Sequence, residues 1–182
     1  MLKLIELDKE HLDAVRSGLQ EIKENPTPYD IHIAETAVEY MDKNFDDFLE
    51  VLETQRSEKQ PEGWVPATTL WLFDDDKFIG LYNIRHRLNE VLIKTGGHVA
   101  YQIIPSQRRK GYVKAGLKLV LRWCHENLGL EEVLLSCKQT NIASYNAMTS
   151  VMRDMGGYQR PDDIINGEVE HSVWIKTRKA DL

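Results

Sequence analysis

The hydrophobic positions of the chain follow a helical spacing near its N-terminus. After a short apolar segment at residues 2–5, which predicts a strand, a helix is predicted over residues 9–23. Its apolar face is formed, at intervals of three and four, by Leu12, Val15, Leu19 and Ile22. A second helix is predicted over residues 45–59, whereas residues 26–44 show no pattern that predicts a structure. The N-terminal third is therefore predicted to be mainly helical.

From residue 68 the pattern changes to that of strands. The β-forming segments 68–73 and 78–84 flank Asp74-Asp75-Asp76, which predicts a hairpin. The later segments alternate between the two patterns, with strands predicted at 98–104, 133–135 and 169–175 and helices at 113–128 and 142–155. This order predicts an α/β protein, a three-layer fold with a central mixed sheet flanked by helices.

Length and charge narrow the class of protein. A chain of 182 residues suits a single domain, and its net charge of -6 disfavours a nucleic-acid or anionic-membrane partner. The N-terminal segment contains acidic residues and no long apolar run, so we expect no signal peptide and no membrane span. Cys124 and Cys137 lack the spacing of a zinc site, and we expect them to be buried free thiols in the cytoplasm.

The segment of residues 101–113 has the composition of a binding site for anions. Three consecutive cations, Arg108-Arg109-Lys110, precede Gly111 at the junction where a strand passes through a loop into a helix. The unpaired N–H groups and the positive dipole end of a helix start suit a phosphate. Pro105 lacks an N–H, so it ends the strand ladder and frees groups that an extended ligand can pair with. The sequence has neither a Walker loop nor a dinucleotide fingerprint, and a solvated basic loop is the alternative.

The same residues resemble the GNAT superfamily of N-acetyltransferases, in particular a bacterial subgroup. Arg108-Arg109-Lys110-Gly111-Tyr112-Val113 is similar to its R/Q-x-x-G-x-G/A signature, Asn141-Ile142-Ala143-Ser144 to the start of its next helix, and Gly156-Gly157-Tyr158 to the turn that follows. The resemblance covers residues 80–157. It implies a GNAT-like, mostly antiparallel twisted sheet within one domain over residues 1–182. Residues 1–64 would be the acceptor side and residues 65–160 the acetyl-CoA-binding core.

The resemblance also implies roles for single residues. Backbone amides would cradle the pyrophosphate of acetyl-CoA at Arg108, Arg109, Lys110, Gly111, Tyr112 and Val113. The backbone of Tyr101, Gln102 and Ile103 would pair with pantetheine, and Asn141 and Ser144 would face the pantetheine arm or the phosphates. Val113 departs from the family pattern, in which glycine or alanine is usual, and its branched side chain narrows the approach to the helix start.

Direct acetyl transfer to an amine needs a base for the ammonium proton and an acid for the leaving thiolate. Tyr145, in the first turn of the helix opened by Asn141, is the candidate acid, with core packing as the alternative. His98, at the start of the central strand, is the candidate base, with a role in the turn as the alternative. Glu170 and His171 alternate on the last strand, so only one of them can face a cleft.

These observations predict an N-acetyltransferase that moves an acetyl group from acetyl-CoA to an amine of a small molecule or peptide. We expect no metal and no covalent enzyme intermediate, because neither cysteine lies in a nucleophile motif. The alternative from another class is a coenzyme-A-binding module that senses or regulates without turnover. An anion-binding scaffold without coenzyme is a third. The sequence leaves the acceptor and a homodimer open.

Overall fold

The computed structural model describes residues 1–41 and 43–178 and divides the chain into two units. Unit 1 comprises Met1–Ile84 and Tyr101–Tyr112, and unit 2 comprises Arg85–Ala100 and the residues from Val113 onward. The hairpin of residues 67–84 and the loop before Tyr112 group with the N-terminal helices, and the predicted acceptor side (residues 1–64) and coenzyme-binding core (residues 65–160) stay predictions.

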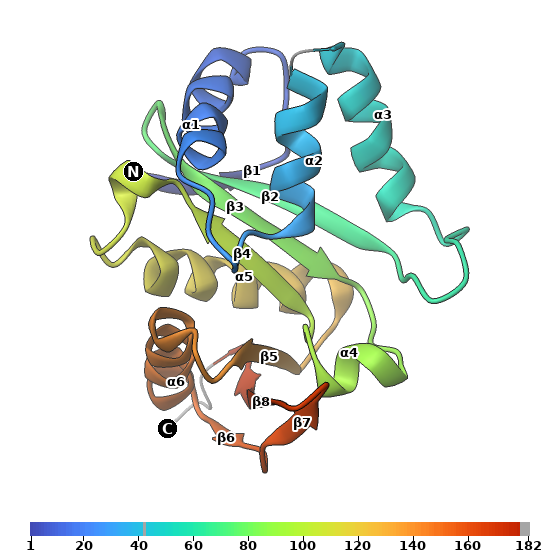
Figure 1. Ribbon diagram of the computed structural model, residues 1–182, viewed down its shortest axis with the longest axis vertical. Helices are drawn as coiled ribbons and strands as arrows, with labels where there is room; N and C mark the ends of the chain where they lie inside the picture. Colours follow the sequence, from blue (N-terminus) through green and yellow to red (C-terminus); the bar gives the residue numbers. More distant parts are fainter. Residues whose placement is uncertain (42, 179–182) are drawn as a thin grey trace. The chain divides into compact units, whose positions relative to one another are not determined.

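Unit 1 consists of helices that cover one side of a sheet with the strand order β1-β2-β3-β4 (Figure 1). Its elements are β1 (Leu2–Ile5), α1 (Leu12–Glu24), α2 (His32–Met41), α3 (Phe45–Arg56), β2 (Ala67–Asp74), β3 (Lys77–Arg85), β4 (Val99–Ile103) and the 3-10 turn η1 (Pro105–Gln107). The strands β1 and β2 pair antiparallel, with Leu4 opposite Leu72. The predicted hairpin is confirmed, and α2 occupies the stretch for which the sequence predicted nothing.

The core of unit 1 forms where α1 meets the sheet. The predicted apolar face of α1 is buried through Val15, Leu19 and Ile22, which belong to one cluster with Trp71 and other side chains of β2 and β3. Gly18 permits the close approach of helix and sheet, because a Cβ atom there would lie 2.5 Å from the ring of Phe78. Burial of this face contributes most of the helix's stability, since an isolated helix of this length is marginal in water.

Unit 2 contains a second sheet with the order β5-β8-β6, and β7 also pairs with β8. Its elements are α4 (Glu90–Lys94), α5 (Tyr112–Leu128), β5 (Glu132–Lys138), α6 (Ile142–Met155), β6 (Gly157–Gln159), β7 (Asp163–Ile165) and β8 (Glu168–Lys176). The pairs β5–β8, β6–β8 and β7–β8 are all antiparallel. Helix α6 lies beside this sheet (Figure 1), and its Met148 is fully buried, as expected of a core residue.

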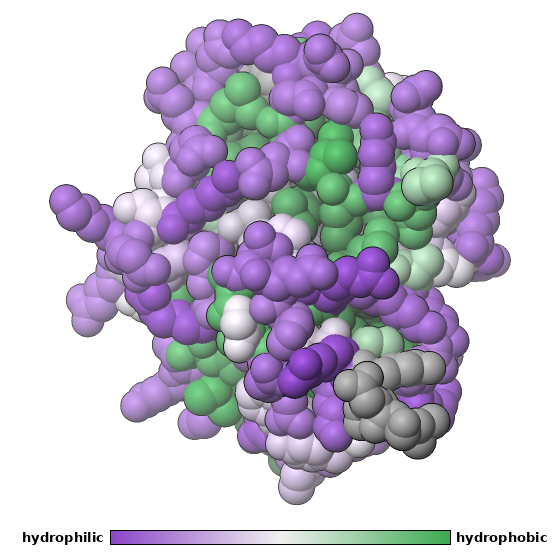
Figure 2. Space-filling model, turned by 180° about the vertical axis from the view of Figure 1, so that it is seen from behind, coloured by the Kyte–Doolittle hydropathy of each residue, from purple (hydrophilic) through white to green (hydrophobic). Residues whose placement is uncertain are grey.

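The predicted fold class is confirmed: antiparallel sheets flanked by helices, in the predicted order of elements. The short elements α4, β6 and β7 were not predicted, because three to five residues carry too little periodicity. Both cysteines are buried free thiols, as expected. Hydrophilic side chains make up much of the face shown in Figure 2, in keeping with 29% charged residues.

Candidate active site

The loop between η1 and α5 has the backbone of an anion site. The N–H of Arg108 closes η1 by donating to Pro105 O (3.3 Å), after which the chain turns with Arg109 at φ 62° and Gly111 at φ 83°. A Cβ atom at Gly111 would meet nothing within 4 Å, so the space beside its Cα is open. Only glycine adopts this conformation without strain.

The N–H groups of this loop are available to a ligand. Within residues 1–41 and 43–178, no hydrogen bond uses the N–H of Arg109, Lys110 or Gly111. Helix α5 begins at the next residue, so these N–H groups lie just before the positive end of a helix dipole. Successive N–H groups around a left-handed residue form a concave donor site for phosphate. The loop therefore fits the pyrophosphate that the sequence resemblance implies.

Three side chains of the loop have hydrogen-bond partners within unit 1. Arg108 Nε donates to Ile103 O (3.1 Å), and Lys110 Nζ donates to the amide oxygen of Gln107 (3.1 Å). The hydroxyl of Tyr112 donates to Asp74 Oδ2 (3.0 Å), a bond that raises the pKa of Tyr112 and is the main reason that the pKa of Asp74 is lowered. Arg109 is exposed, and its charge is open to a ligand.

The strand β4 presents an edge of its sheet. Ile104 N–H donates to Ile79 O of β3 (3.0 Å), and because backbone groups alternate, those of Tyr101 and Ile103 point to the opposite edge. Tyr101 is half-buried, with its ring centroid 5.8 Å from that of Tyr82. Strand β3 approaches so closely that a Cβ atom at Gly80 would lie 2.2 Å from Gln102 O.

The side chain of Gln102 has a structural role that the sequence did not predict. It is buried, its Oε1 accepts from Ile31 N (2.9 Å), and its Nε2 donates to Asp30 Oδ1 (2.7 Å). The same carboxylate accepts from the N–H and hydroxyl of Thr27. The loop between α1 and α2 is thereby fixed to β4, and no signal in the sequence connects residues about seventy positions apart.

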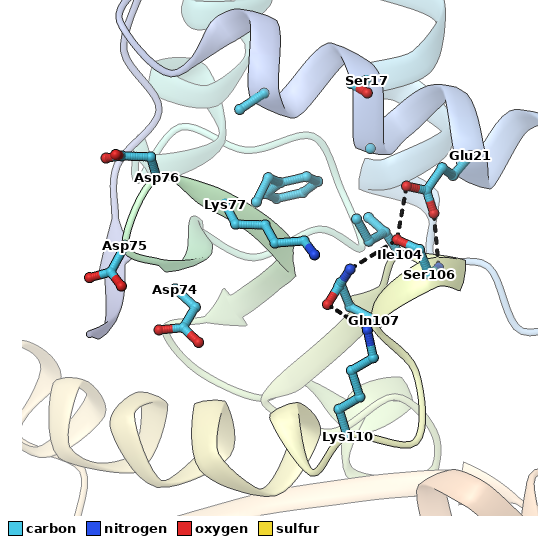
Figure 3. A pocket seen from close by; sticks show the side chains of 13 residues that line it. Ser17, Glu21, Asp74, Asp75, Asp76, Lys77, Ile104, Ser106, Gln107 and Lys110 are labelled. Atoms are coloured by element: carbon cyan, nitrogen blue, oxygen red, sulfur yellow. Dashed lines mark hydrogen bonds between the residues drawn. The ribbon is translucent and has the colours of Figure 1, made fainter.

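An open depression of about 860 Å³ lies beside the loop within unit 1 (Figure 3). Phe78 and Ile104 are among the apolar residues that line it, while Lys77 points into it. Glu21 of α1 accepts from the N–H and the hydroxyl of Ser106, both at 2.9 Å. These two bonds attach η1 to α1 and hold the start of the following loop in place.

In unit 2, Asn141 and Ser144 open α6. Asn141 Oδ1 accepts from Ser144 N (3.1 Å), so the amide oxygen caps the helix. The Ser144 hydroxyl bonds the thiol of Cys137, whose pKa burial nevertheless raises to about 11. Burial likewise raises the pKa of Cys124 to about 12, so both thiols are protonated near neutral pH. The predicted contacts of Asn141 and Ser144 with the coenzyme stay predictions.

Tyr145 lies on the first turn of α6, against β8. Its ring centroid is 4.7 Å from that of His171, and its hydroxyl donates to Gln159 Oε1 (3.4 Å). The residue is half-buried, so its phenol is neither packed into the core nor fully solvated. Its role as the acid stays a prediction.

His98 is placed differently from what a base requires. The residue is 5% exposed. Its ring Nδ1 accepts from Leu134 N (3.0 Å), and its backbone N–H donates to Leu134 O (2.7 Å). Burial, helped by the charge of Arg85, lowers the pKa of His98 to about 4. A weakly basic imidazole whose acceptor atom is already bonded joins two strands, so these contacts do not support the predicted catalytic role. The sequence placed His98 at a strand end but could not show that its ring is covered.

Among residues 1–41 and 43–178, no cluster of three or more His, Cys, Asp or Glu side chains is placed to hold a metal ion. In the same part of the chain, no helix has the length and apolar character needed to cross a membrane.

Comparison with known proteins identifies the class to which this fold and loop belong. A family model described as an acetyltransferase (GNAT) domain matches residues 2–151. The chain therefore belongs to the GNAT acetyltransferases, enzymes that use acetyl-CoA as the acetyl donor. No curated protein matches the sequence.

Solved structures of this class share the fold at low sequence identity. RimL, a ribosomal L7/L12 alpha-N-protein acetyltransferase in complex with coenzyme A, aligns with a TM-score of 0.63 at 13% identity, over 99% of this chain and 96% of that one. The spermidine/spermine N-acetyltransferase SpeG from Vibrio cholerae aligns with a TM-score of 0.57 at 16% identity, over 97% and 92%. A probable acetyltransferase aligns with a TM-score of 0.59 at 15% identity, over 96% of this chain and 91% of that one.

Proposed function

We propose that this GNAT enzyme transfers the acetyl group of acetyl-CoA to an amine of a small molecule or peptide by direct attack. The observation that carries the proposal is the loop at Gly111, with its left-handed backbone, open space and unpaired N–H groups at a helix start. Each hydrogen bond to a charged phosphate contributes ~1.5–3 kcal/mol, so a few of them supply the ~8 kcal/mol that micromolar affinity requires.

The chain's residues divide the work of binding. The N–H groups of Arg109, Lys110 and Gly111 would hold the pyrophosphate, whereas that of Arg108, predicted to take part, is already bonded to Pro105 O. The outward edge of β4 at Tyr101 would pair with the pantetheine amides. Asn141 and Ser144 would contact the pantetheine arm. A strand N–H that donates to the thioester oxygen would stabilise the developing oxyanion, which is usually the largest contribution to such a reaction.

Amines are the acceptor class that several observations favour. The neighbouring structures include a spermidine/spermine acetyltransferase and an α-N-protein acetyltransferase. The net charge of -6 favours approach of a cationic amine. We further propose that the enzyme works in the cytoplasm, because its two buried free cysteines suit a reducing compartment.

The test measures binding and turnover separately. Calorimetry with acetyl-CoA should show micromolar or tighter binding, and thiol release should be seen with at least one amine from a panel of spermidine, a peptide with a free α-amino group and an amino sugar. Binding without turnover on every amine would favour the sensor, and an absence of binding would refute the assignment of the loop.

A further inference from the structure

A second histidine has the hydrogen bonding that a proton acceptor needs. His171 of β8 lies with its Nδ1 2.7 Å from Oδ1 of Asp162, in the segment between β6 and β7. An ionised carboxylate only accepts hydrogen bonds, so Nδ1 carries the proton and Nε2 keeps its lone pair.

Within the described residues, the hydrogen bonding of His171 leaves the lone pair of Nε2 unused. The side chain is 15% exposed, and no hydrogen bond among residues 1–41 and 43–178 uses Nε2. The groups that face the ring are the phenol of Tyr145 on α6, the thiol of Cys137, its register partner on β5, and Asp162. Asp162 is the charged group of this set, because the Cys137 thiol is protonated near neutral pH.

Other contacts also hold the segment before β7. Arg160 N–H already donates to Ser172 O (3.0 Å), and the Arg160 guanidinium donates to Ile93 O (2.6 Å) and lies 3.5 Å from Asp163. These contacts hold the segment independently of His171, so a change at His171 that keeps its bond to Asp162 should leave the segment in place.

We propose that His171, oriented by Asp162, accepts the proton of the amine that attacks acetyl-CoA, beside Tyr145, which protonates the leaving thiolate. This inference rests on the proposed function. All three residues belong to unit 2, and Tyr145 follows Ser144, the residue expected to contact pantetheine. Asp162 is a positioning residue, because it acts through the imidazole.

The proton balance of the step closes. The acceptor ammonium gives one proton to Nε2 of His171, and the neutral amine attacks the thioester carbon, forming the C–N bond. Collapse of the tetrahedral intermediate breaks the C–S bond, and Tyr145 protonates the thiolate. The nitrogen loses its second proton to restore the phenol, and the imidazolium releases its proton to solvent. The products are the acetamide, coenzyme A with a free thiol, and one proton.

The test uses a variant that keeps the hydrogen bond and removes the titrating atom. In His171→Asn the amide nitrogen takes the place of Nδ1 and can still donate to Asp162, whereas nothing replaces Nε2. His11→Asn is the matched control, because His11 forms the same 2.7 Å contact with Asp8 in unit 1, with its ring against Phe73 instead of a tyrosine. Thermal unfolding and acetyl-CoA affinity are measured for each variant.

Thiol release is then followed with the best amine of the panel and with hydroxylamine, which is already neutral at pH 7. For His171→Asn we expect kcat/KM for the protonated amine to fall ~100-fold or more, as for loss of a general base. The rate with hydroxylamine should stay within threefold, and the acid limb of the pH profile should disappear. Asp162→Asn should lower kcat/KM by a smaller factor, and His11→Asn should match the wild type.

Equal losses with both nucleophiles, or an unchanged kcat/KM for the protonated amine, would overturn the role of His171 while leaving the acetyltransferase assignment intact. A wild-type protein that turns over no amine would overturn the proposed function and this inference with it. If His171→Asn does not fold, His171→Gln is measured in the same way and is subject to the same criteria.

Discussion

Substitutions of different charge at Gly111 can test whether the loop binds the phosphates of acetyl-CoA. Its φ of 83° lies in the left-handed region, and a Cβ atom would meet nothing within 4 Å. A substitution there introduces no clash with the protein. It adds a conformational cost of ~1–2 kcal/mol and places a side chain where the phosphate is expected.

The magnitudes separate strain from charge. Gly111→Gln carries the strain, which lowers the free energy of unfolding, and the bulk of a neutral side chain. We expect this bulk to cost ~1 kcal/mol of binding, or about fivefold in acetyl-CoA affinity. Gly111→Glu adds repulsion. At ~6 Å and an effective dielectric constant of ~40, one carboxylate and one phosphate charge repel by about 1.4 kcal/mol, so two phosphates weaken binding about a further hundredfold. Gly111→Lys should bind at least as well as Gly111→Gln.

Isothermal calorimetry at two salt concentrations provides the readout, because salt screens the charge effect but not the strain. Gly167 is the matched control: its φ is 82°, a Cβ atom there also meets nothing within 4 Å, and it lies in the turn between β7 and β8. Gly167→Glu should lose similar stability and no affinity. Equal affinities for Gly111→Glu and Gly111→Gln would show that no phosphate lies beside Gly111.

Three other predictions concern stability. The pKa of His98 is lowered to about 4 in the folded protein, so between about pH 6.5 and 4 the unfolded chain binds a proton that the folded chain does not. The free energy of unfolding should therefore decrease as the pH is lowered through that window. In urea titrations, His98→Gln should make this dependence on pH shallower. Hydrogen bonds from Lys118 and Lys114 lower the pKa of Asp154 to about 2, so its contribution to the free energy of unfolding is present above about pH 4 and is lost toward pH 2. In urea titrations, Asp154→Asn should unfold at a lower urea concentration than the wild type at pH 7 but not at pH 2. Gly80→Ala should destabilise the protein by ~2–4 kcal/mol in denaturant titrations, because its Cβ would overlap Gln102 O and force the backbones apart; an unchanged midpoint would contradict the close approach.

Periodicity predicted the long elements because burial imposes it. The stripe of Leu117, Val120, Leu121 and Cys124 is buried along α5, as the spacing indicated. Helix α2 was not predicted, because two prolines precede it and its apolar pattern is weak. Its buried face consists largely of Ile33, Ala34 and Ala37.

The candidate site was likewise predictable only where its signals are local in the sequence. The loop at Gly111 could be predicted, because glycine and helix-start signals are local in sequence. The sequence favoured His98 over His171 as the base, because a strand position does not reveal whether Nδ1 meets a backbone N–H or a carboxylate. The partner of His171, Asp162, lies nine residues away across a turn whose pairing the sequence did not predict.

The three cations that first indicated an anion site act in different ways. Arg108 uses its guanidinium to bind Ile103 O at the outward edge of β4, so this side chain holds the loop against the strand. The carbonyl of Ile103 is then already bonded, and pairing with an extended ligand falls to the groups at Tyr101, one alternation earlier. Lys110 donates to a neutral amide and keeps its net charge, and Arg109 is exposed. The charges that we expect to meet a phosphate are therefore those of Arg109 and Lys110, while Arg108 holds the loop against the strand edge.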